Sequence, residues 1–98
     1  MNINININSK VIANANYVFR EEYDDWALLF NPESSETFGM NQISAFIYKH
    51  LNGELSIYHI VNKLRSECKN APANADTIVL EFVKSMVAKG LAEERESS

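Results

Sequence analysis

Few side chains of this sequence could act in catalysis, and they lie far apart. Cys68 could serve as a nucleophile, and His50 and His59 could ligate a metal ion. Cys68 falls on the apolar stripe of a predicted helix with no base spaced to activate it, which favours a buried structural thiol. No cysteine or carboxylate stands at metal-ligand spacing from either histidine. We therefore expect a protein that is not an enzyme and that binds no metal and no cofactor.

The acidic residues give no stronger indication of catalysis. Glu21, Glu22, Asp24 and Asp25 form a run of carboxylates, and such runs are usually a solvated face. The sequence contains no phosphate-binding loop, zinc motif or nucleophile elbow. A binding function is the better prediction.

Composition limits the possible partners and the compartment. The chain has 98 residues, of which 46% are hydrophobic, so it can form one domain without metals or disulfides. Thirteen acidic against nine basic residues give a net charge of -4, which disfavours nucleic acid as a partner. The single cysteine excludes an intrachain disulfide, and no apolar run is long enough for a signal peptide or a membrane span. We expect a cytoplasmic protein with no membrane partner.

The first half of the chain has the alternating pattern of strands. Residues 17–23 and 26–30 are rich in aromatic and aliphatic side chains, and Asn31-Pro32 should end the second strand because proline cannot donate to a ladder. Residues 36–40, ETFGM, fit a short edge strand. These segments predict a three-stranded antiparallel sheet. The Asn-Ile repeat of residues 1–10 fits either an extra strand or a mobile tail, since asparagine is a poor strand former.

The period changes to that of a helix at Asn41. Asn41 is a good N-cap for a first helix, which Asn52-Gly53 should end. Ser56 should cap a second helix, and a third should start near residues 74–76 and stop at Gly90. The polar residues that follow should be solvated.

These elements predict an α+β fold that is winged-helix-like, with a three-stranded antiparallel sheet followed by a three-helix bundle. The predicted organisation is an N-terminal tail or extra strand over residues 1–16, one domain over residues 17–91 and a disordered tail over residues 92–98.

The third predicted helix carries more apolar surface than one core contact needs. At about 100° per residue, its apolar positions form a central stripe and one flank. The stripe contains Val79, Phe82, Val83 and Met86, and the flank contains Leu80, Val87 and Leu91. Neighbouring helices or the sheet would normally cover such a flank. Alternatively, the flank and an edge strand at residues 36–40 would form a groove suited to strand addition by a peptide.

The order of these features resembles the PqqD-like proteins, the peptide chaperones of pyrroloquinoline quinone biosynthesis whose fold recurs as the RiPP recognition element. The resemblance rests on WALLFNPES at residues 26–34, and on ETFGMNQISAFIYKHLNGELSIYHIVNKL at residues 36–64. It implies a domain that binds the leader segment of a ribosomally made precursor peptide. Such a domain delivers that peptide to a modifying enzyme, commonly a radical SAM enzyme.

The resemblance and the apolar flank together predict a site. A leader peptide would bind as a fourth strand along the edge, with its apolar side chains on the third helix and an acidic one near a lysine. The edge residues are Glu36, Thr37, Phe38, Gly39 and Met40, and the helix residues are Leu80, Val83, Lys84 and Val87.

Two other functions stay open. Two short helices joined by NGELS also describe a helix-turn-helix, so the chain could be a DNA-binding regulator, although its second helix offers few cations. It could also be a structural subunit with a large permanent interface. Either a monomer or a dimer is compatible with the sequence.

Overall fold

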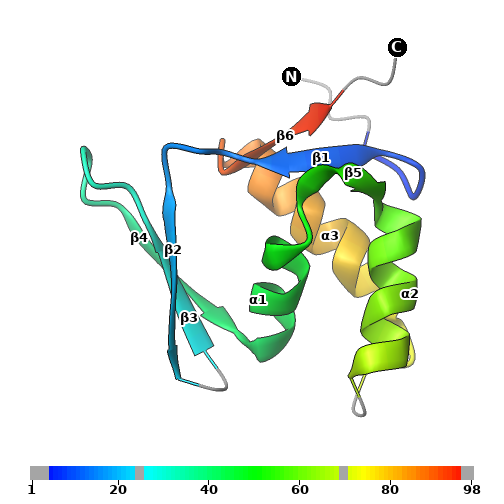
Figure 1. Cartoon of the computed structure of the whole chain (residues 1–98). Coiled ribbons are helices and arrows are strands. Elements are labelled where there is room, and N and C mark those ends of the chain that lie inside the picture. The colour runs from blue at the N-terminus through cyan, green and yellow to red at the C-terminus, as the bar shows by residue number, and fades with distance from the viewer. Residues whose placement is uncertain (1–4, 24–25, 69–70, 96–98) are drawn as a thin grey trace.

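The computed structural model describes residues 5–23, 26–68 and 71–95 (Figure 1). The described residues form an α+β fold with three helices and two small three-stranded antiparallel sheets. In chain order the elements are β1 (Lys10–Ala13), β2 (Val18–Tyr23), β3 (Trp26–Phe30), β4 (Thr37–Asn41), α1 (Gln42–Lys49), β5 (Asn52–Ser56), α2 (Ile57–Glu67), α3 (Ala75–Ala88) and β6 (Ala92–Arg95).

The predicted antiparallel sheet is confirmed as β2–β3–β4, with β3 in the centre. Ala27 and Leu29 of β3 are fully buried, whereas Trp26 is 38% exposed. Successive side chains of a strand point to opposite faces, so one face of this sheet packs on the core and the other turns away from it. Figure 1 shows the helices of the described chain on one side of the sheet only.

The second sheet, β5–β1–β6, was not predicted. The prediction that the first helix continues to Asn52-Gly53 is wrong, because α1 ends at Lys49 and residues 52–56 form β5. Residues 92–95, assigned to the solvated tail, form β6. Both strands pair with β1, which is distant in sequence, and no local pattern encodes such a pairing.

The Asn-Ile repeat is described only in part, since residues 1–4 lie outside the described ranges. Residues 5–9 form no strand, and residues 10–13 form β1. The carbonyl oxygens of Ser9 and Ile7 accept hydrogen bonds from Ile57 N and Tyr58 N, at 3.0 and 2.8 Å. They therefore satisfy two of the unpaired N–H groups at the start of α2.

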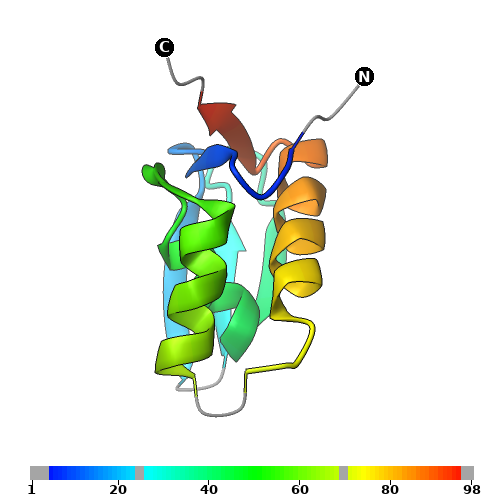
Figure 2. The ribbon, with the colours of Figure 1, turned by 90° about the vertical axis from the view of Figure 1, so that its right-hand side faces the viewer.

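The core lies between the helices and the inner face of β2–β3–β4. Figure 2 shows α2 and α3 side by side, with α1 and this sheet behind them. Fully buried side chains come from every helix and include Ile47, Ile57, Ile60, Leu64, Val79 and Val83. Tyr48 stacks on Phe19 of β2 at 5.1 Å between ring centroids, and burial raises the pKa of its hydroxyl above the ordinary value.

Among the described residues, none of the helices has the length and apolar character to cross a membrane.

The predicted helix caps are confirmed. Asn41 Oδ1 accepts a hydrogen bond from Ser44 N at 2.8 Å, and Ser56 Oγ accepts one from His59 N at 3.3 Å. Gly90, with φ of 77°, ends α3, and Leu91 N donates to Met86 O.

We expect Asn41→Ala to lower the free energy of unfolding by about 1 kcal/mol, because Ser44 N loses its partner. Urea denaturation measures this, and Asn62→Ala, which changes an exposed asparagine inside α2, is the matched control.

Candidate functional site

The β4 strand is an edge of its sheet, as predicted. Asn31 N donates to Glu36 O at 2.9 Å, so these residues form a hydrogen-bonded pair beside the β3–β4 turn. Hydrogen-bonded and non-bonded pairs alternate along an antiparallel ladder. The alternation leaves the N–H and C=O groups of Thr37 and Gly39, and the N–H of Asn41, pointing away from β3. The C=O of Asn41 belongs to α1, because the carbonyl of an N-cap residue accepts the first hydrogen bond of its helix. This edge can therefore accept another strand.

A groove lies between this edge and α3. It has a volume of about 340 Å³ and is lined by Thr37, Phe38, Gly39, Met40, Phe82, Ser85, Met86, Lys89 and Leu91. Met40 and Met86 are almost fully buried and form its floor, whereas Phe38 and Phe82 are only partly covered. The groove thus combines free backbone groups on one wall with apolar side chains on the other.

The far end of the groove carries a positive charge. Lys89 Nζ lies 5.8 Å from the centroid of the Phe38 ring, and the Lys89 side chain is exposed. The Tyr17 ring also lies 6.3 Å from the Phe38 ring, centroid to centroid. The Tyr17 hydroxyl donates to Glu36 Oε1 at 3.2 Å. Phe38 therefore contacts both an aromatic ring and an ammonium group at the groove wall.

Four of the five predicted edge residues, Thr37 to Met40, line the groove, and Glu36 immediately precedes β4. The predicted helix residues lie elsewhere. Val83 is fully buried in the core. Leu80 and Lys84 project about 160° away from Phe82 around the helix. Val87 lines a different hollow of about 540 Å³ with Asn14, Asn16, Gly90, Ala92 and Glu93.

The helix residues that the sequence analysis did not assign to the groove are Phe82, Ser85, Met86 and Lys89. Helical periodicity groups these residues on one side of the helix, because they fall within about 60° of Phe82 on the helical wheel. That periodicity could not show which flank faces β4. The central apolar stripe predicts Phe82 and Met86 as core positions, and of the two only Met86 is buried.

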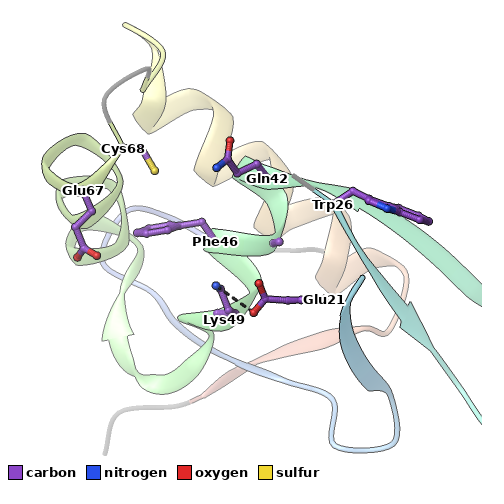
Figure 3. Close-up of a pocket in the computed structure, with 8 residues that line it drawn as sticks. Glu21, Trp26, Gln42, Phe46, Lys49, Glu67 and Cys68 are labelled. Atoms are coloured by element: carbon purple, nitrogen blue, oxygen red, sulfur yellow. Dashed lines mark ion pairs between the residues drawn. The ribbon is translucent and has the colours of Figure 1, made fainter. Parts of the chain in front are cut away.

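A second hollow, of about 260 Å³, lies where α1 meets the end of α2 (Figure 3). Glu21 and Lys49 form an ion pair of 3.3 Å across its lower side, and Phe46 projects into it. Cys68 lies at its rim as the C-cap of α2 and is partly exposed, so the prediction of a buried thiol is wrong. This hollow contains no free strand edge.

The two histidines make local contacts. His50 Nδ1 lies 2.7 Å from Phe46 O, and His59 Nδ1 lies 2.8 Å from Ser56 Oγ. Within the described ranges, no three metal-binding side chains come together.

Comparisons with known proteins concern the fold and the family of the chain. No curated protein matches the sequence. The structure of TbiB1 in complex with the TbiA(beta) leader peptide matches with a TM-score of 0.69 and 17% identity, over 88% of this chain and 99% of that one. The heterocyclase TruD matches with a TM-score of 0.64 and 18% identity, over 92% of this chain and 12% of TruD. At these identities the likeness concerns the fold.

A family model gives the assignment. The model for coenzyme PQQ synthesis protein D (PqqD) matches residues 27–92, which are 66 of the 98 residues and extend from β3 to the start of β6. The match therefore includes β4, α3 and the groove between them. The chain belongs to the PqqD family.

Proposed function

We propose that this chain binds the leader segment of a ribosomally synthesised precursor peptide as an added strand on β4 and presents that peptide to a modifying enzyme. The observation that carries the proposal is the groove, which places the unpaired edge of β4 beside partly covered aromatic side chains of β4 and α3. Membership of the PqqD family supports it. The matching fold of TbiB1, which was solved with a leader peptide, supports it further.

The groove suggests how such a peptide is read. Its backbone bonds to the free groups of Thr37, Gly39 and Asn41, and this sets the register. Alternate side chains then point toward α3, where Phe82 offers an apolar contact. A carboxylate of the peptide next to Lys89 would gain a charge-assisted hydrogen bond. We therefore propose a leader with alternating apolar residues and an acidic residue at the Lys89 end.

The enzyme that acts on the bound peptide is a separate chain in this proposal, and we expect a radical SAM enzyme. The heterocyclase TruD illustrates an enzyme of which a domain of this fold forms only a small part. The chain would act as a chaperone that holds the substrate for such an enzyme.

A paired substitution on α3 tests the binding site. Phe82 faces the groove, and Leu80 is also partly buried but lies on the opposite flank. We expect Phe82→Ala to weaken binding of the leader peptide encoded beside this gene by roughly tenfold, and Leu80→Ala to change it by less than about twofold. Isothermal titration measures both affinities.

An amide titration of labelled protein with the same peptide locates the contact. We expect chemical shift changes in residues 37–41 and 78–89. If Leu80→Ala weakens binding and Phe82→Ala does not, the peptide lies on the flank of Leu80 and Val87. If the changes are confined to α1 and α2, the groove is not the site.

DNA binding is less well supported as a function. On α2, Lys63 pairs with Glu67 at 3.5 Å, and Arg65 pairs with Asp76 of α3 at 3.8 Å. These pairs reduce the positive charge that a recognition helix needs for phosphate contacts.

A further inference from the structure

The outer face of the β2–β3–β4 sheet carries a second surface. Its apolar side chains are Val18, Trp26, Leu28 and Phe30, which we call the outer patch. Trp26 is 38% exposed and Val18 is 39% exposed. The side chains that pack on the core from this sheet include Phe19, Ala27, Leu29 and Met40, and none of the outer patch is among them. The patch is therefore separate from the hydrophobic core.

The strand register makes the patch continuous. Val18 is opposite Phe30, and Arg20 is opposite Leu28, which is opposite Gly39 on β4. Gly39 has no side chain. The atom nearest to the position that a Cβ of residue 39 would occupy is Cζ3 of Trp26, at a distance of 4.0 Å. Figure 3 shows the Trp26 ring pointing away from α1. The patch thus forms an apolar surface that reaches β4, the edge to which the peptide is proposed to add.

We propose that the outer patch docks the peptide-modifying enzyme, so that the enzyme binds beside the leader strand. This inference rests on the proposed function. A strand added to β4 would turn alternate side chains to the same face as Leu28 and Gly39. The enzyme would therefore meet one surface made of the patch and the peptide together.

The size of the patch favours an enzyme over a second copy of this chain. A stable interface buries about 800 Å² on each partner, or roughly 20–30 residues a side. Four side chains, each of them more than half covered, are too few for a permanent dimer. They suit the centre of a transient contact that releases the chain after each reaction.

The charged residues near the outer patch indicate which charges the enzyme surface should carry. Arg20 on β2 is already paired with Glu22 at 3.7 Å, whereas Glu33 is exposed at the β3–β4 turn. The enzyme surface should therefore present a small apolar area with a basic residue on the side of this turn.

Leu28→Glu tests the docking surface, and Tyr58→Glu is the matched control. Tyr58 is 54% exposed on α2, and Figure 1 shows α2 on the far side of the molecule from the β2–β3–β4 sheet. The probes are the modifying enzyme and the leader peptide encoded in the same gene cluster, each titrated separately against the full chain. We expect Leu28→Glu to weaken binding of the enzyme by about tenfold or more and to leave leader affinity within about twofold, and Tyr58→Glu to change neither.

The outcomes separate the two proposals. If Leu28→Glu binds the leader normally and the enzyme as tightly as the wild type, the docking proposal is overturned and the proposed function stands. If the wild type binds the enzyme through Leu28 but does not bind the leader, the proposed function fails and the docking surface stands.

Sedimentation that shows a wild-type dimer abolished by Leu28→Glu, with enzyme binding intact, assigns the patch to a second copy. Should Leu28→Glu not fold, Leu28→Thr combined with Val18→Thr removes apolar area and keeps strand propensity.

Discussion

Gly39→Pro is expected to abolish most leader-peptide binding while the domain stays folded. The N–H of Gly39 points away from β3, so proline there removes no bond of the existing sheet. It removes one bond to the added strand and leaves a buried carbonyl of the peptide unpaired. This costs about 2–4 kcal/mol, or roughly 30- to 1000-fold in affinity. Titration calorimetry with the leader peptide measures the loss.

Two controls accompany this variant. Gly39→Ala keeps the N–H, and the position has room for a Cβ, so its leader affinity should stay close to that of the wild type. Phe38→Pro removes an N–H that bonds to β3, so it should destabilise the sheet itself. Wild-type leader affinity in a folded Gly39→Pro protein would rule out strand addition at β4.

Val83→Asp is expected to unfold the domain. Val83 is fully buried, and so are its neighbours in the core Val79 and Leu64. An aspartate there would either bury a charge without a partner or remain protonated at a cost of several kcal/mol. Since small domains are stable by about 5–15 kcal/mol, such a loss removes most of the folded population. Thermal denaturation followed by circular dichroism measures it.

Ser85→Asp provides the matched comparison on the same helix. Ser85 is exposed and lines the groove, so the domain should remain folded with a Tm within a few degrees of the wild type. The new charge should weaken binding of an acidic leader. A folded Val83→Asp protein that has lost only leader binding would show that Val83 faces the groove after all.

The sequence by itself determined the elements whose causes are local. The N-cap at Asn41 and the stop at Gly90 depend on neighbours within a few residues, and both are present. The continuous apolar run of residues 26–30, the Asn31-Pro32 stop and the alternation in residues 36–40 were enough to predict β3 and an edge strand at β4. The PqqD resemblance also came from the order of such local features, and the family model confirms it.

Only the tertiary structure decided the second sheet and the helix wall of the groove. β1 joins β5 and β6 through pairings across about 40 and 80 residues of chain, which no local period encodes. Helical periodicity assigns Phe82 to the central stripe and Leu80 to one flank, and it does not show which side of the helix faces β4. That choice depends on how α3 rotates to bury Val79 and Val83, and this rotation turns Phe82 and Lys89 toward the open edge of the sheet.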